Sequence, residues 1–300
     1  MSDTSALDDT QGSGQAPEPS HLRVALGFFI LPLMLVVGAV GVFLLFGLIA
    51  HEDKPASEYL TEVTGGGINE PWQAAFHLAQ KLARDDSLHG DATLARSIAQ
   101  TLEHKNARNP KVREFLVLAL GSVGHPSSVP VLSGCLDDED ADVRLKTLLA
   151  LGSIGPPSAT PAAPAIAELL ADEDVGVRTY AAYLLGMLEN QTVRAPLAVA
   201  LNDPAFQVRG NAAVALARLG DAGGLPELHK MLDRDYLASN PDLNPQQQRD
   251  AMVAAIQALG LLGSVEARSK LESLESNDPD LRVREAARAV LTVLQRAARP

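Results

Sequence analysis

The residue types that catalyse reactions or bind metal ions are scattered along this sequence. The histidines are His21, His51, His77, His89, His104, His125 and His229. None of them stands in an HxxxH or HExxH pattern, which would place two zinc ligands on one face of a helix. No GxSxG motif occurs, and TGGGINE at 64–70 lacks the Lys and Ser/Thr of a phosphate-binding loop. We therefore expect no catalytic residue, no metal site, no cofactor and no enzymatic activity.

The cysteine content and the charge balance exclude two further classes of function. Cys135 has no second cysteine with which to form an intrachain disulfide or a Cys-based metal site. The 300 residues carry a formal net charge of −12 and no run of Lys or Arg. Such a surface repels nucleic-acid phosphate, so we expect no nucleic-acid partner.

The first fifty residues predict a tail followed by a membrane anchor. Residues 1–22 are rich in Ser, Gly, Pro and acid, and a segment with so few apolar residues is predicted to be disordered. Val24–Ala50 holds 27 residues without a charge, more than the about 20 that span a bilayer. The apolar part of a signal peptide, the alternative, is only roughly 7–15 residues long. We predict one transmembrane helix over 23–50, in the inner membrane of a bacterial cell.

The flanks of this segment decide its orientation only weakly. Arg23 precedes it and Lys54 follows it, so the positive-inside comparison is one against one. A single N-terminal anchor more commonly leaves its large domain outside the cytoplasm, so we expect that orientation, and the reverse stays open. Residues 51–69 are interpreted as a juxtamembrane linker with a glycine-rich hinge.

The rest of the chain, 70–300, is a repeat array. Blocks such as DVRLKTLLALGSIG at 142–155 and QVRGNAAVALARLG at 207–220 recur six times. The arginines of the six blocks are Arg113, Arg144, Arg178, Arg209, Arg249 and Arg284. Their spacings of 31, 34, 31, 40 and 35 residues predict a stack of similar units.

Each unit is predicted to be a pair of helices joined by a polar turn. Apolar residues fall 3, 6, 7 and 10 places after the arginine, which makes one face of the second helix. Asp, Asn and Pro in the preceding turn can cap that helix. The glycines eleven places after the arginine are expected to end it in a left-handed conformation. They are Gly124, Gly155, Gly220 and Gly260.

The combination of Val-Arg, small residues and Ala-Leu-Gly after an Asp-rich turn resembles the HEAT-like repeat described in phycobilisome lyases. The resemblance covers roughly residues 90–298, with Glu70–Arg84 as a capping helix, and implies an all-α, HEAT-like α-solenoid. It also implies that the repeat arginines are structural and pair with turn carboxylates. The carboxylates expected in this ladder are Asp140, Asp174, Asp203 and Asp280.

The family includes enzymes. Deoxyhypusine hydroxylases hold iron with several His-Glu dipeptides, whereas this chain has one, His51-Glu52, outside the repeats. The chromophore (bilin) lyases remain the alternative, as an enzyme or an assembly factor, although they are soluble as a rule and no lyase residue can be placed here.

Positions that differ among the copies are the candidates for recognition. Residues two and nine places after the arginine are about two turns apart and share a helix face. Those expected to contact a partner are Phe115, Lys146, Tyr180, Met187, Asn211 and Arg218. Tyr236 joins them, on a long loop over Asp233–Gln248 that accounts for the 40-residue spacing. Simple gap-filling by Phe115 and Tyr180 remains an alternative. The function we expect is that of a membrane-anchored scaffold or adaptor for another protein.

Overall fold

A computed structural model describes residues 33–34, 36–42, 54–65 and 70–297, and the chain divides into two units at Lys54 and Pro55. The predicted tail, most of the predicted transmembrane segment and the glycine hinge at 66–69 lie outside the described residues. The described part of the first unit, within 33–42, is helical, and its side chains are exposed. No helix in the described ranges is both long and apolar enough to cross a membrane.

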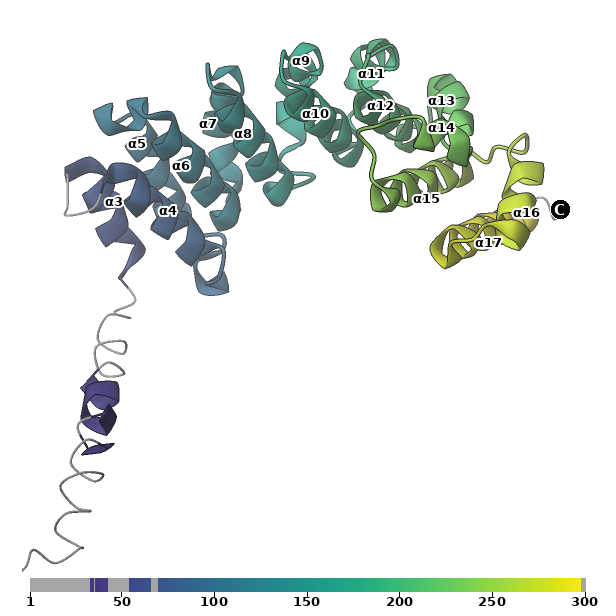
Figure 1. Cartoon of the computed structure of the whole chain (residues 1–300). Coiled ribbons are helices and arrows are strands. Elements are labelled where there is room, and N and C mark those ends of the chain that lie inside the picture. Colours follow the sequence, from purple (N-terminus) through teal and green to yellow (C-terminus); the bar gives the residue numbers. More distant parts are fainter. Residues whose placement is uncertain (1–32, 35, 43–53, 66–69, 298–300) are drawn as a thin grey trace, which may run out of the picture. The chain divides into compact units, whose positions relative to one another are not determined.

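The second unit consists of stacked helix pairs (Figure 1). It opens with α3 (Ala56–Gly65) and α4 (Pro71–Leu82). The first helices of the six pairs are α5 (Ala92–Leu102), α7 (Val129–Gly134), α9 (Ala163–Glu168), α11 (Arg194–Ala200), α13 (Leu225–Lys230) and α16 (Arg268–Asn277). The second helices are α6 (Pro110–Val123), α8 (Ala141–Ile154), α10 (Val175–Leu188), α12 (Phe206–Arg218), α15 (Pro245–Leu261) and α17 (Leu281–Ala297). The predicted six-unit, all-α array is confirmed.

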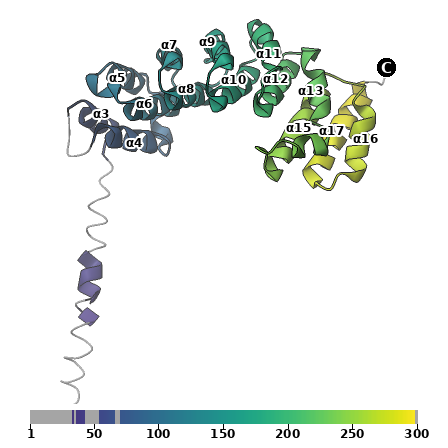
Figure 2. The ribbon, with the colours of Figure 1, turned by 45° about the horizontal axis from the view of Figure 1, so that its top comes forward.

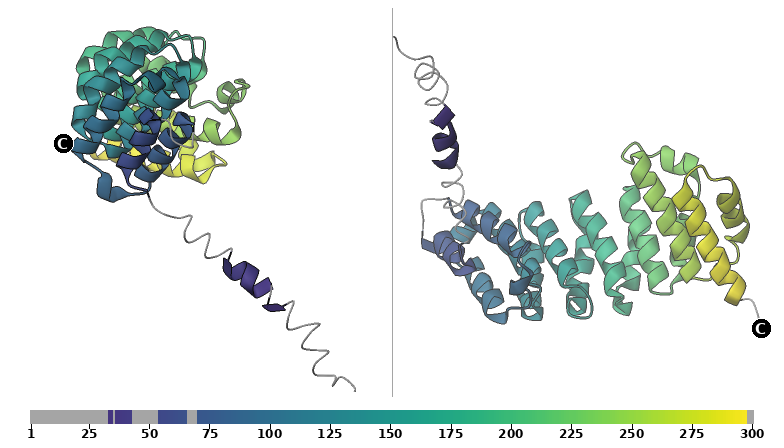
Figure 3. Two further views of the ribbon diagram at one scale, coloured as in Figure 1. Left: turned by 90° about the vertical axis from the view of Figure 1, so that its left-hand side faces the viewer. Right: turned by 90° about the horizontal axis from the view of Figure 1, so that it is seen from below.

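The second helices form one continuous row. Each of α4, α6, α8, α10, α12, α15 and α17 contacts the next in this order, and Figure 3 shows them side by side. The unit bends so that this row lies on the inside of the curve, with the first helices outside (Figures 1 and 2).

The expected buried face explains why these segments fold as they do. All but one of the 24 residues that lie 3, 6, 7 and 10 places after the six arginines are buried, the exception being the half-buried Ile154. Thr147 is the one polar side chain among them, and its hydroxyl donates to the carbonyl of Val143 at 2.8 Å. The buried residues form two clusters, one on each side of α12, which contributes to both.

The turns before the second helices provide the predicted caps. The carboxylate of Asp140 accepts from the N–H groups of Asp142 and Val143 at 2.9 and 3.3 Å, and Asp174 accepts from Val177 at 2.9 Å. Satisfying free N–H groups at the start of a helix is worth about 1 kcal/mol per cap.

The predicted glycine ends of the second helices are confirmed at three positions of four. Gly124, Gly155 and Gly220 have φ of +67, +64 and +71°. The prediction is wrong for Gly260, because α15 continues past it to Leu261. The glycine with positive φ after this helix is Gly263, at +64°. Gly260 instead lies against Val290 of α17.

Two segments interpreted as irregular contain helices. α3 lies within the predicted linker and buries Leu60 and Val63 in the first cluster. The predicted loop at Asp233–Gln248 contains a short helix, α14 (Arg234–Ala238), and the first turn of α15. Leu237 anchors α14 in the second cluster.

Candidate partner-binding surface

The repeat arginines join consecutive units, as expected, although mostly through other carboxylates. The guanidinium of Arg113 lies 2.6 Å from a carboxylate oxygen of Asp138, and Arg144 lies 2.6 Å from Asp172. Both contacts are bidentate. Asp140 and Asp174, the expected partners, are helix caps instead. The turns read Asp-x-Asp, and the first aspartate binds the arginine while the second caps the helix.

The third contact is the predicted one. Arg178 lies 2.8 Å from Asp203, whose turn reads Asp-Pro-Ala and has no second aspartate. The N-cap residue of α12 is Ala205, which makes no side-chain cap. This turn therefore keeps the aspartate that binds the arginine and lacks the one that caps the helix.

Five of the six repeat arginines also donate to backbone carbonyls of the turn before their own helix. Nη1 of Arg144 donates to the carbonyls of Asp138 and Glu139 at 2.8 and 3.2 Å. Arg178 donates in the same way to Asp172 and Glu173. The aspartate of one turn thus accepts from the preceding arginine through its side chain and from the following arginine through its backbone. The result is a relay across the units, and the arginines are not free to bind a partner.

At the insertion the relay uses different residues. Arg209 lies 3.3 Å from Glu227, and the hydroxyl of Tyr236 donates to that carboxylate at 2.6 Å. Glu227 is buried, so Tyr236 completes the hydrogen bonding of an otherwise costly buried charge. Arg234 of α14 then binds Asp278 at 2.6 Å.

The last two repeat arginines therefore make different contacts from the expected close pairing with a turn carboxylate. Arg249 lies 3.3 Å from Asp250 and 3.8 Å from the predicted partner Asp280. Arg284 donates to the backbone carbonyls of Asp278 and Pro279. Sequence comparison missed Arg234 because it lies in the segment without a counterpart in the other units.

The environment of the relay lowers the pKa of three of its carboxyl groups. Burial raises the pKa of Asp138, Asp172 and Asp278, but hydrogen bonds from their arginines and from a backbone N–H outweigh it. The pKa of each of these three carboxyls therefore lies below its usual value. The relay is built to stay ionised.

A different set of positions reaches solvent along the row of second helices. We define the second-helix face as the residues two, five and nine places after each repeat arginine. Of these 18 residues only Ala258 is buried. It includes the predicted partner residues at positions two and nine, of which Arg218 is exposed and the others are half-buried.

Aromatic side chains gather on this side of the unit. Eight aromatic residues follow residue 54, and six of them lie on second helices or on α4 in the same row. Phe206 of α12 is buried, which leaves five at or near the surface. They are Trp72, Phe76, Phe115, Tyr180 and Tyr183. Trp72, Phe76 and Tyr183 have exposed fractions of 38, 37 and 42%. Exposed aromatic residues are typical anchors of protein interfaces.

Four of these rings contact one another in two pairs, one between helices and one within a helix. Phe115 of α6 meets Phe76 of α4 edge to face, with centroids 5.2 Å apart, and Tyr180 lies 5.5 Å from Tyr183 on α10. The Tyr180 ring extends over α8, where Gly152 leaves room for its hydroxyl. Phe115 and Tyr180 therefore pack between helices and still reach the surface.

Three residues of this region were not predicted, for identifiable reasons. Trp72 and Phe76 precede the first aligned block, so no comparison between copies could select them. Tyr183 lies five places after its arginine, outside the two positions used for the prediction; its counterparts there include Leu149 and Val214. Comparing that position would have found it.

Two predicted residues have contacts within the repeats. The amide of Asn211 donates to the carbonyl of Thr179 at 3.1 Å and so links α12 to α10. Tyr236 lies in the Arg209–Glu227 group and against Phe206, with ring centroids 5.9 Å apart. Partner binding by either residue stays a prediction, and the structure gives both a packing role.

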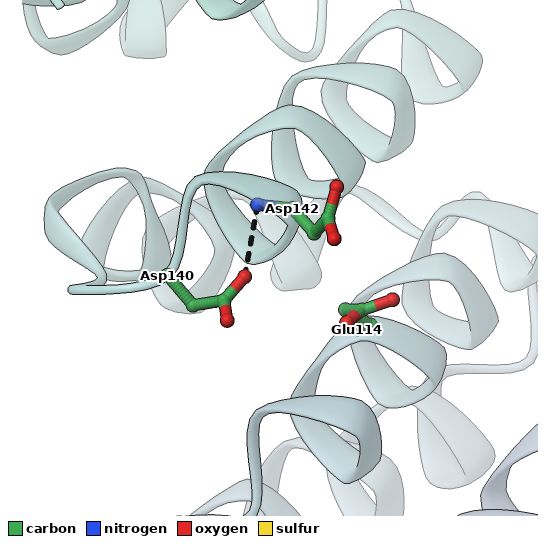
Figure 4. A group of neighbouring side chains, drawn as sticks. All are labelled: Glu114, Asp140 and Asp142. Carbon is green, nitrogen blue, oxygen red and sulfur yellow. Dashed lines mark hydrogen bonds between the residues drawn. The ribbon is translucent and has the colours of Figure 1, made fainter. Parts of the chain in front are cut away.

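Three carboxylates approach one another at the start of α8 (Figure 4). Oxygens of Glu114, Asp140 and Asp142 lie within 4.8 Å. The ammonium group of Lys111 lies 2.7 Å from Glu114 and 3.9 Å from Asp142, and Asp140 caps α8. A cation of the protein itself therefore compensates this group.

A mostly apolar groove lies on the outer side, between α9 and α11. It has a volume of about 490 Å³ and is lined by Ala167, Pro196 and four neighbours. No aromatic side chain lines it, so it offers none of the anchors found on the second-helix face.

Cys135 is a poor nucleophile in this fold. Its side chain is partly buried at the end of α7, and burial raises the pKa of the thiol to about 11. Metal binding and covalent catalysis both require the thiolate, which is scarce at neutral pH.

The comparisons with known proteins agree with the architecture. Residues 98–163 and 162–238 match the model of the HEAT repeats. No curated protein matches the sequence. Several solved structures resemble the chain at low sequence identity, and they bear on the fold alone.

An engineered protein is similar with a TM-score of 0.57 and 19% identity over 80% of this chain and 68% of that one. YIBA of Escherichia coli is similar with a TM-score of 0.56 and 19% identity, over 80% of this chain and 82% of YIBA. A chain in the complex of CpcE and CpcF of phycocyanin lyase from Nostoc sp. PCC7120 is similar with a TM-score of 0.50 and 17% identity. The match covers 81% of this chain and 97% of that one. The matched model and these solved structures agree with the stacked helix pairs in indicating HEAT-like repeats over residues 98–238.

Proposed function

We propose that this chain is a membrane-anchored scaffold that binds another protein through the second-helix face and the adjoining rings of α4. The observation that carries the proposal is the aromatic surface of α4, α6 and α10, with Trp72, Phe76 and Tyr183 exposed. A HEAT solenoid presents such a long surface on a rigid support, and protein binding is its typical use. The repeat arginines are structural and contribute nothing to recognition in this proposal.

The anchor is part of the same proposal. Val24–Ala50 has no charged residue, and the described apolar side chains within it, such as Met34 and Val37, are exposed. Exposed apolar residues of this density are stable in lipid and costly in water. The protein should stay in the membrane fraction after carbonate washing and be released by detergent. A chain lacking residues 1–53 should be recovered in the supernatant, and its retention in the membrane would contradict the anchor.

We also propose that the solenoid lies outside the cytoplasm, the orientation expected from the sequence. Protease added to intact spheroplasts should then digest residues beyond Ala50. Protection in intact spheroplasts together with digestion after lysis would reverse the orientation and leave the scaffold proposal intact.

Site-specific crosslinking tests the binding surface directly. A photoreactive phenylalanine analogue at position 183 should yield a discrete adduct with one protein in intact membranes. The same analogue at Gln100, an exposed residue of the first helix α5, is the matched control and should yield none. Equal adducts at both positions, or none at 183, would contradict the proposal.

The alternative, a chromophore lyase or assembly factor, is examined on the same material. A bilin-binding protein would carry a visible absorption band at one chromophore per chain after incubation with bilin. Stoichiometric bilin together with the absence of any protein adduct would favour that alternative.

A further inference from the structure

The charges of the second-helix face differ from those of the chain as a whole. The sequence contains 37 acidic and 25 basic residues. None of the 18 residues of the face is Asp or Glu, and two of them, Lys146 and Arg218, are basic. The acidic residues of the repeats concentrate instead in the turns, where they form the relay and the caps. The face is therefore a locally cationic strip on an acidic protein.

The two cations make no polar contact that holds the described helices together, unlike the repeat arginines. Among the described residues, neither Lys146 nor Arg218 makes a hydrogen bond or an ion pair. This contrasts with Arg113, Arg144 and Arg178, whose guanidinium groups are held by carboxylates. A cation on a surface without a structural partner is available to an anionic group of a ligand.

The position of the cations adds a spatial requirement. Lys146 is on α8 and Arg218 on α12, so α10 lies between them with Tyr180, Tyr183 and Met187. Axes of packed helices are roughly 8–10 Å apart, which puts the cations on the order of 20 Å from each other. That distance corresponds to about six residues of extended chain or about 13 residues of helix.

From this arrangement we infer that the partner presents an acidic protein segment with an aromatic or apolar centre. Its carboxylates meet Lys146 and Arg218, and its centre packs on Tyr180, Tyr183 and Met187. The inference rests on the proposed function and specifies the chemistry of the partner. Charge complementarity of this kind chiefly sets specificity and the rate of association.

The test uses the full chain in its membrane, with the photoreactive analogue at position 183. The double variant Lys146→Glu with Arg218→Glu should reduce the yield of the adduct about tenfold or more, because like charges now face each other. The matched control is Arg96→Glu with Lys270→Glu, which changes the net charge equally at exposed residues of the first helices α5 and α16. This control should leave the yield unchanged.

The adduct itself identifies the bound segment. Mass spectrometry of the crosslinked peptide should show at least two Asp or Glu residues flanking an aromatic or large apolar residue. A basic or neutral peptide, a crosslinked lipid, or an unchanged yield in the Lys146→Glu/Arg218→Glu variant would overturn the inference. The scaffold proposal would survive a basic or neutral peptide and an unchanged yield in the variant. It fails separately, when position 183 of the otherwise unchanged chain gives no protein adduct.

Discussion

At the scale of single residues, the Asp-x-Asp turn divides two tasks that the sequence alone does not separate. Asp172 binds Arg144, and Asp174 caps α10. Asp172→Ala should lower the free energy of unfolding by about 3 kcal/mol, because it leaves a largely buried guanidinium without its carboxylate. Asp174→Ala should cost about 1 kcal/mol, the usual loss of a cap. Urea unfolding followed by circular dichroism measures both, and the reverse order would contradict the assignment.

The single cysteine provides a second test at this scale. With its pKa raised from 9.0 to about 11, Cys135 should be alkylated at pH 8 about 100-fold more slowly in the folded chain than in urea. Stability should also decline above about pH 9, where the unfolded state ionises its thiol and the folded state does not. Iodoacetamide labelling with mass detection gives the rates, and similar rates in both states would show that the thiol is not protected.

At the scale of the helix, the ends of the second helices obey the glycine rule with one exception. α10 ends at Leu188, and the next residue, Glu189, has φ +50° and is the only described residue other than glycine with positive φ. Glu189→Gly should therefore raise stability by about 1 kcal/mol. Gly220→Ala is the matched control, because φ is +71° and no atom lies within 4 Å of the added Cβ. It should cost a similar amount, and thermal melts of both variants decide the point.

Contacts between second helices also depend on absent side chains. A Cβ at Gly186 of α10 would lie 2.9 Å from Cα of Ala215 on α12, whereas one at Gly134 of α7 would meet nothing within 4 Å. Gly186→Ala should destabilise the chain by about 1–3 kcal/mol through overpacking. Gly134→Ala should instead stabilise it by up to about 1 kcal/mol through helix propensity. Equal effects in thermal melts would show that α10 and α12 can separate at little cost.

At the scale of the whole molecule, the periodic part of the fold could be predicted and the aperiodic part could not. Repetition of a 34-residue pattern identified the buried faces, because every copy needs the same residues to stack. α3, α14 and the Arg234–Asp278 pair have no counterpart in the other units, so no comparison could reveal them. Helical geometry fixes which positions share a face, so the sequence could group positions two and nine after the arginine. Their use stays a prediction, since variation among copies shows freedom from stacking and not what binds.

The relay predicts how the array as a whole responds to acid. Its carboxyls at Asp138, Asp172 and Asp278 have a pKa below the usual value in the folded state. A depressed pKa contributes stability that is fully present above the unfolded value of about 3.9 and is lost as the pH falls through the folded value. The melting temperature should therefore vary little from pH 7 to about 4.5 and fall steeply below about pH 4.

Because these three carboxyls lie at different points along one stack, the acid response should be shared by the whole unit. Asp172→Asn removes one titrating group, so this variant should melt lower at pH 7 and lose less on acidification than the unchanged chain. Asp235→Asn, at an exposed residue of α14, is the control and should leave the pH profile unchanged. An acid transition identical in the Asp172→Asn variant and the unchanged chain would mean that groups outside the relay set the acid stability, because only a carboxyl with different pKa values in the folded and unfolded states can make stability depend on pH.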